Sequence, residues 1–322
     1  MLTEQDAVVK ILDGAEIPHA VLKGSSLSVC YRQPDSRPLG DIDLLVRPED
    51  LERVRDLMME AGFSLMPEEH SYHIGLYRGK TVLEVHFAMS RPHRSGGGKL
   101  ANEVMVEFDR QVRRESLSGH SFPALDEGRQ ALSLLLHMES HLSHDGLGLR
   151  QFCDWAVFAA SVPGAQFTGE ILPLLESCGL GRFARVVTRC CVTYLGLPAE
   201  LVGWCMDAPV ELCDGMMSEM LRTGNMGRSV HTVDLGYMMK SPQENKRSFG
   251  AFWANIRALV KRSYPVLEKF PMLFPFCLVH RFMLFLWRLV RKKGTFSRLM
   301  SSLFSAKSRE TLYDQMHLFE TE

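Results

Sequence analysis

The spacing of apolar residues in the first third of the chain alternates between the helical and the strand period. Residues 3–15 place apolar side chains on one helical side, and residues 20–22 form a short apolar run before a glycine. Residues 91–99 contain three consecutive glycines and are expected to form a mobile loop. The pattern predicts helices over 3–15, 25–32 and 48–61, strands over 20–22, 41–46, 71–77 and 81–87, and a loop over 62–70.

From about residue 123 onward only the helical period remains. The pattern predicts helices over 127–142, 149–160, 168–178, 181–195, 209–222 and 249–262, followed by a basic and apolar segment. We therefore expect an α+β protein with a boundary near residue 120, because 322 residues are enough for two domains. The first domain would span 1–120 and hold a small mixed sheet with helices, and the second would span 121–322 and be all-helical.

The composition is ordinary for a folded protein, with 46% hydrophobic and 23% charged residues and a net charge of −1. The charge is unevenly distributed, since residues 246–298 hold twelve Lys or Arg and one acid, Glu268. Such a segment can contact phosphates, nucleic acid or an anionic membrane surface, or it can be a solvated basic helix face. No nucleic-acid-binding motif supports the second of these partners.

The cysteines and the chain start indicate a cytoplasmic protein. The eight cysteines form no CxxC pair, and several lie in apolar surroundings typical of reduced core residues. The N-terminus lacks the basic start and apolar run of a signal peptide. The apolar segment 270–290 is interrupted by prolines and by His280, Arg281 and Arg288, so it is too short to span a bilayer.

Two acids in one apolar strand carry the strongest chemical signal. Asp41 and Asp43 share a strand face, about 7 Å apart along the chain. Carboxylates this close repel each other unless a cation lies between them, and Mg²⁺ takes such oxygens together with substrate phosphates. Upstream, the turn at residues 23–26 (Lys-Gly-Ser-Ser) can bring backbone N–H groups close to a phosphate. Glu84 lies in another apolar strand, where an unpaired carboxylate would be costly.

The order of turn, acidic pair and third acid resembles the nucleotidyltransferase fold of the DNA polymerase β superfamily. More narrowly, the chain resembles an uncharacterised nucleotidyltransferase family with an "LKG…R…DIDLLV…G…vElH" pattern. The matching stretches are Leu22-Lys23-Gly24, Arg37, Asp41-Ile42-Asp43-Leu44-Leu45-Val46, Gly62-Phe63 and Leu83-Glu84-Val85-His86. The resemblance continues weakly at His137, His141, Arg150, Cys153-Asp154-Trp155 and Arg262-Ser263-Tyr264-Pro265.

The resemblance implies an enzyme that moves a nucleoside monophosphate from an NTP to a hydroxyl or phosphate acceptor and releases pyrophosphate. Asp41 and Asp43 would hold two Mg²⁺ or Mn²⁺ ions shared with the triphosphate. Glu84 would help to hold the second metal and could accept the proton of the attacking hydroxyl. The acceptor is not implied.

The resemblance also suggests groups that bind the nucleotide. The backbone amides of Gly24 and Ser25, with the Ser25 hydroxyl, would surround the terminal phosphates. Lys23 and Arg37 are candidate phosphate contacts, and Arg150 is a candidate to reach the nucleotide.

Structural alternatives stand beside these roles. The two aspartates could bond backbone amides at a strand end, and Glu84 could pair with Arg37 or Lys80. His86 is more often a packing residue than a ligand. Arg150 and Asp154, four apart on a helix, could form an intrahelical pair. Trp155 is expected in the core.

Further alternatives concern other ligands and other functions. His137, His141 and His144 could meet on one helix face and bind zinc with Asp145, although packing is the simpler interpretation. The protein could also be a non-catalytic nucleotide-binding or regulatory protein of the same fold. A third hypothesis is peripheral contact with an anionic membrane through 246–298.

Overall fold

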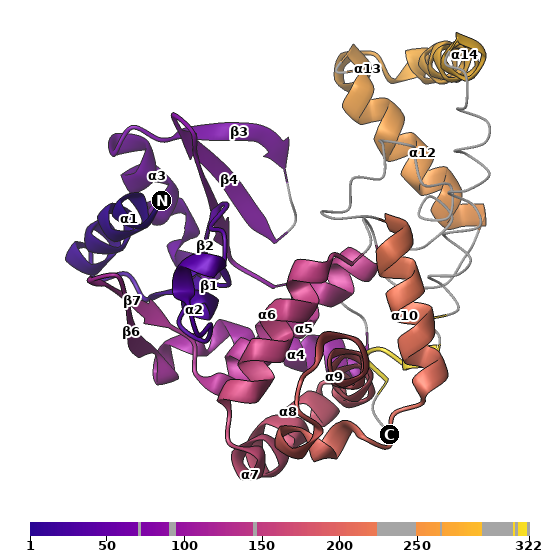
Figure 1. Ribbon diagram of the computed structural model, residues 1–322. Helices are drawn as coiled ribbons and strands as arrows, with labels where there is room; N and C mark the ends of the chain where they lie inside the picture. The colour runs from indigo at the N-terminus through magenta and orange to yellow at the C-terminus, as the bar shows by residue number, and fades with distance from the viewer. Residues whose placement is uncertain are drawn as a thin grey trace.

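A mixed sheet of seven strands occupies the N-terminal part of the described chain in the computed structural model (Figure 1). The structure describes residues 1–69, 72–89, 95–143, 147–223, 249–264, 266–291, 312 and 315–320. The strand order is β3-β4-β5-β2-β1-β7-β6. The strands are β1 (His19–Leu22), β2 (Ile42–Val46), β3 (Ser64–Glu69), β4 (His73–Arg78), β5 (Thr81–His86), β6 (Arg113–Leu117) and β7 (His120–Ala124).

Strand β2 lies at the centre of the sheet and sets the register of its neighbours. It pairs antiparallel with β1, so that Leu22 lies opposite Asp43. It pairs parallel with β5, so that Asp43 lies opposite Glu84. Strands β4 and β5 form an antiparallel hairpin closed by Arg78 opposite Thr81. The three strands thus bring residues that are far apart in sequence into one row.

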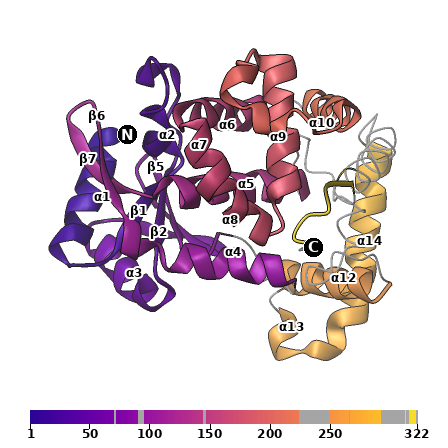
Figure 2. The ribbon, with the colours of Figure 1, turned by 90° about the horizontal axis from the view of Figure 1, so that it is seen from below.

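The two faces of the sheet are covered by different helices (Figures 1 and 2). One face contributes Val21, Leu44 and Val85 to a core formed with α1 (Leu2–Gly14) and α3 (Leu51–Glu60). The alternate residues of the same strands, Ala20, Leu22 and Leu45, join the core of the helical part. Because side chains alternate along a strand, Asp43 and Glu84 lie on this second face.

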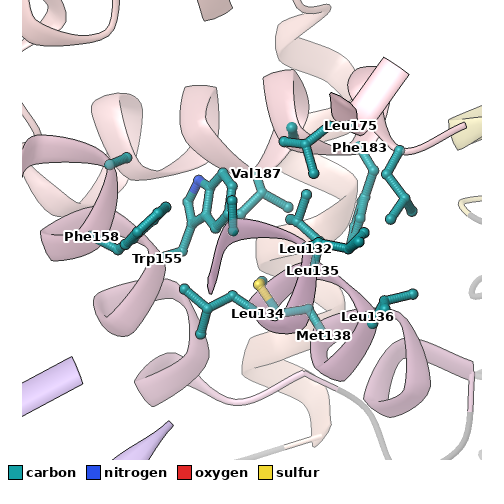
Figure 3. Close-up of a cluster of buried hydrophobic side chains, with 14 of the residues drawn as sticks. Leu132, Leu134, Leu135, Leu136, Met138, Trp155, Phe158, Leu175, Phe183 and Val187 are labelled. Atoms are coloured by element: carbon teal, nitrogen blue, oxygen red, sulfur yellow. The ribbon is translucent and has the colours of Figure 1, made fainter. Parts of the chain in front are cut away.

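The helical part packs around α5 (Glu127–Ser143) and α6 (Leu149–Ser161), as Figure 3 shows. The buried indole N–H of Trp155 donates to Thr188 Oγ1 at 2.8 Å, which satisfies the polar group of a core residue. Trp155 therefore lies in the core, as predicted. The other helices of this part are α7 (Gly164–Gln166), a π-helical turn (Phe167–Ile171), α8 (Leu172–Ser177), α9 (Gly181–Leu195) and α10 (Val210–Thr223).

Three predictions in the N-terminal part were wrong or incomplete. Residues 96–99, expected in a mobile loop, begin helix α4 (Gly96–Val106), whose first turn is capped by the Ser95 side chain. The segment expected as loop over 62–70 contains β3. Helix α2 (Gly24–Ser28) is shorter than the expected 25–32.

The predicted α+β class is confirmed, since helices follow the sheet along the chain. The division at residue 120 stays a prediction. The sheet's strand β7 continues to Ala124, and one buried cluster contains residues on both sides of that position, among them Leu22 and Leu135.

The C-terminal part contains α12 (Phe249–Ser263), α13 (Val266–Lys269) and α14 (Phe274–Arg291). Among the described residues, no helix combines the length and the apolar character needed to cross a membrane. Several large apolar side chains of this part are exposed, including Phe276 at 73% and Met272 at 87%.

Candidate active site

The structure brings the three predicted acids together where β2 pairs with β5. Asp41 immediately precedes β2, Asp43 lies within it, and Glu84 faces Asp43 from β5. One carboxylate oxygen from each of the three lies within 4.8 Å of the others. A group of three oxygen ligands at this spacing suits a hard divalent cation such as Mg²⁺ or Mn²⁺.

The three carboxylates differ in their surroundings. Burial and the charges of Asp43 and Glu84 raise the pKa of Asp41 above its ordinary value. Burial would also raise the pKa of Asp43, but the nearby Lys23 ammonium and His86 outweigh it and lower that pKa strongly. For Glu84, the hydrogen bond from His86 overcomes the effect of burial, so its pKa is lowered. Asp43 and Glu84 are therefore ionised at neutral pH.

Lys23 lies beside Asp43 because it directly follows β1, which pairs with β2. The preceding residue, Leu22, lies opposite Asp43. The Nζ atom of Lys23 is 2.9 Å from Asp43 Oδ1. The backbone of Lys23 has a positive φ of 43°, a rare conformation for a residue with a side chain. Burial disfavours the charged amine, but Asp43 outweighs this effect and raises the pKa of Lys23.

His86 contacts two of the acids and is not merely a packing residue. Its Nε2 lies 3.0 Å from Asp43 Oδ1 and 3.5 Å from Glu84 Oε2. These contacts outweigh burial and raise the pKa of His86. The other ring nitrogen, Nδ1, is buried and has no hydrogen-bond partner among the described residues. Glu84 thus contacts His86, whereas the ion pairs considered for it were with Arg37 and Lys80.

Arg37 takes part in a buried network with α6. Its Nε and Nη2 each donate to Asp154 at 2.8 Å, and the Tyr31 hydroxyl donates to the same carboxylate. The partners of Asp154 are Arg37 and Tyr31, and none of the interactions among the described residues joins it to Arg150, so the intrahelical pair considered for Arg150 and Asp154 is not formed. Burial and the Asp154 charge raise the pKa of Tyr31, so this hydroxyl remains a donor.

The remaining candidates for nucleotide binding lie in different settings. The Ser25 hydroxyl is buried and donates to Gln5 Oε1 at 2.7 Å. Gly24 has a positive φ of 25° and opens α2, next to Lys23. Arg150 lies exposed in the first turn of α6. None of the interactions found among the described residues joins Arg150 to the acids, and its role in nucleotide binding stays a prediction.

The histidines of α5 approach the acidic site from the helical side. Burial lowers the pKa of His137 well below its ordinary value, and the charge of Lys23 acts in the same direction. The rings of His137 and His141 are 4.5 Å apart. His144 and Asp145 lie outside the described residues. Among the described residues, the side chains spaced to hold a metal ion form two groups, Asp41 with Asp43 and Glu84, and His73 with Glu84 and His86. Neither group includes His137 or His141, so the zinc hypothesis gains no support.

A protein-family model described as an uncharacterised nucleotidyltransferase matches residues 1–196. This stretch includes the whole sheet, the acidic site and helices α5 and α6. A search of curated proteins gave no significant match.

Two solved structures of ANT(2″)-Ia show low similarity to this chain. One is a crystal structure in complex with adenylyl-2″-tobramycin, with 12% identity, a TM-score of 0.41 and coverage of 55% of this chain and 95% of that chain. The other is a solution structure of this antibiotic-resistance factor, with 12% identity, a TM-score of 0.38 and coverage of 61% and 95%. At these scores the likeness supports no statement about substrates of the present protein.

Proposed function

Because the chain belongs to the uncharacterised nucleotidyltransferase family, we propose that it transfers a nucleoside monophosphate from an NTP to a hydroxyl or phosphate acceptor and releases pyrophosphate. The resemblance inferred from the sequence and the enzyme class are thereby confirmed. The observation that supports the proposed reaction is the convergence of Asp41, Asp43 and Glu84 within 4.8 Å.

The residues of the site fit a divalent cation, Mg²⁺ or Mn²⁺, by the chemistry of their donors. Asp41, Asp43 and Glu84 would hold the ions, which when bound orient the α-phosphate and offset the charge of the departing pyrophosphate. Asp43 is ionised in advance because Lys23 lies beside it. Its carboxylate is therefore ready to bind a cation at neutral pH.

The acceptor would be activated by Glu84. Its pKa is lowered by the His86 hydrogen bond, so the carboxylate is free of a proton and can take one from an attacking hydroxyl. Lys23 would contact the triphosphate after turning from Asp43. The amides of Gly24 and Ser25 would bind terminal phosphates, whereas the Ser25 hydroxyl is already bonded to Gln5.

The direct test is pyrophosphate release with each labelled NTP and Mg²⁺ or Mn²⁺. Loss of a metal ligand removes several kcal/mol of transition-state stabilisation, so Asp43→Asn should lower the rate by about 1000-fold. Asp56→Asn is the matched control, because Asp56 is 61% exposed and lies in a surface ion pair. Equal rates for Asp43→Asn and wild type would overturn the proposal.

Two measurements together distinguish the alternative of a nucleotide-binding protein without turnover. Such a protein would bind NTP in calorimetry and would release no pyrophosphate with any acceptor that is added. The acceptor itself could be a small molecule or a nucleic acid, although no nucleic-acid-binding motif supports the latter.

A second candidate function rests on the exposed apolar side chains of α14. Phe276, Val279 and Met283 follow helical spacing and are 73%, 60% and 58% exposed. Residues 246–298 are strongly basic. Apolar and basic residues on one helix are typical of contact with an anionic membrane surface.

The reduced state of the eight cysteines fits a cytoplasmic location.

A further inference from the structure

The hairpin of β4 and β5 places two imidazole rings beside Glu84. His73 lies directly opposite His86, and Gly75 lies opposite Glu84. All four positions share the sheet face that carries Asp43. Because Gly75 has no side chain, nothing from β4 covers the Glu84 carboxylate at this position. The ring centroids of His73 and His86 are 5.0 Å apart.

The ligand atoms of these side chains have the spacing of a metal site. One nitrogen or oxygen each from His73, Glu84 and His86 lies within 4.8 Å of the other two. Ligands bound to one ion at about 2.1 Å are about 3–3.5 Å apart. Side-chain rotations that move each atom by roughly 1 Å would therefore close the group around an ion.

The burial of the imidazoles also points to a ligand. His73 and His86 are 7% and 4% exposed. Within the part of the chain that the structure describes, His86 Nδ1 is buried without a hydrogen-bond partner, and such a polar atom is costly unless something binds it.

We propose that His73, Glu84 and His86 bind a transition-metal dication, such as Mn²⁺, Co²⁺ or Zn²⁺, next to the carboxylate site. Two imidazoles and one carboxylate favour these ions over Mg²⁺, which prefers oxygen ligands. Since Glu84 belongs to both groups, the ion lies adjacent to Asp43. The proposal extends the proposed function, but the binding needs neither nucleotide nor turnover, because the protein supplies three ligands.

Cobalt binding to the full-length protein, stripped of metal and free of nucleotide, tests this site. We expect one Co²⁺ per chain with visible d–d absorption, and at least about 10-fold weaker binding by His73→Ala. His120→Ala is the matched control, because His120 lies on β7 with its side chain 30% exposed, and it should bind as wild type does. Asp41→Asn should lose transferase activity and keep the cobalt site.

Mn²⁺ provides a second readout that does not depend on affinity. Electron spin echo modulation should show nitrogen coupling to bound Mn²⁺ in the wild type and a weaker coupling in His73→Gln, whose fold is checked by circular dichroism. Equal cobalt affinities for wild type and both His73 variants would overturn the proposal, and so would Mn²⁺ bound without nitrogen coupling in Asp41→Asn, in which the neighbouring carboxylate site has lost a ligand. Inactivity with every NTP would instead contradict the proposed function, and the cobalt and Mn²⁺ measurements would still decide whether this metal site exists.

Discussion

At the scale of single residues, buried charges in this protein are held by close partners. Asp43 is 4% exposed and has Lys23 and His86 within 3.0 Å. Asp154 is 5% exposed and accepts from Arg37 and Tyr31. Because a buried charge without a partner costs several kcal/mol, each of these carboxylates depends on the groups around it.

Replacement of Asp154 tests this dependence away from the acidic site. Asp154→Ala leaves the Arg37 guanidinium buried without its partner, since the Arg37 side chain is 6% exposed. We expect the free energy of unfolding in urea to fall by about 3–5 kcal/mol. Asp56→Ala, which removes an exposed pair with Arg55, should change it by less than about 1 kcal/mol. Similar small losses in both variants would contradict this interpretation of the network.

His19 provides a prediction about pH. Burial lowers the pKa of His19 in the folded protein, and its Nδ1 lies 2.8 Å from the Ile17 carbonyl oxygen. The unfolded chain therefore binds a proton below about pH 6.5 while the folded chain does not, and stability falls as the pH decreases through this range.

His19→Asn keeps an amide nitrogen near the position of Nδ1 and removes the titrating group. The melting temperature of this variant should fall less than that of wild type between about pH 7 and about pH 5.5. The control His120→Asn should follow the wild type. Parallel curves for all three proteins would show that His19 does not contribute to the pH dependence.

At the scale of elements, close backbone contact determines where α4 lies. A Cβ built at Gly97 would lie 2.6 Å from the Cys178 carbonyl oxygen, immediately after α8. A Cβ at the neighbouring Gly96 would meet no atom of the described residues within 4 Å. The glycines that indicated a loop in the sequence thus include one that allows the helix to pack directly on the backbone.

The two glycines form a matched pair of test positions. Gly97→Ala should lower the free energy of unfolding by about 1–3 kcal/mol, because the methyl group forces the two backbones apart. Gly96→Ala should leave it unchanged or raise it by up to about 1 kcal/mol, because alanine favours helix. Urea denaturation of both variants measures the difference. Stabilisation by both substitutions would refute the close packing.

At the scale of the whole molecule, the sheet and the helical part share buried residues, whereas α14 leaves apolar side chains exposed. Leu22 and Leu45 of the sheet belong to the same cluster as Leu135 and Trp155. In contrast, Phe276 and Phe282 of α14 are 73% and 57% exposed. The shared buried cluster stabilises the sheet face that carries the acids, and the exposed side chains of α14 offer a surface to a partner.

Vesicle flotation tests membrane contact by α14. The protein should float with vesicles containing phosphatidylserine, and less with pure phosphatidylcholine or at high ionic strength. The double variant Phe276→Glu/Phe282→Glu should lose binding to the vesicles. Leu221→Glu is the control, since Leu221 is 75% exposed on α10. Equal flotation of the double variant and wild type would exclude α14 as the contact.

The sequence was sufficient to predict the residues whose positions follow from local periodicity. Asp41 and Asp43 lie two apart at one strand, and the order of strands allowed Glu84 to join them. His73 was missed, because the predicted strands 71–77 and 81–87 place His73 opposite Val85, whereas the observed register pairs Arg78 with Thr81 and His73 with His86. The partnership of Arg37 with Asp154 was not predictable, because it joins residues 117 positions apart through tertiary packing. The glycines at 96–98 indicated a loop because no local pattern reveals the packing of Gly97.

The contact between Lys23 and Asp43 gives the deepest acid of the site a built-in counter-ion. A protein that neutralises this carboxylate with its own ammonium does not need a dissolved cation in order to fold. Treatment with a chelator should therefore yield intact, inactive enzyme that regains activity when the ion is restored. Lys23→Met would remove this counter-ion, so the stability of the folded variant should become dependent on added divalent ions.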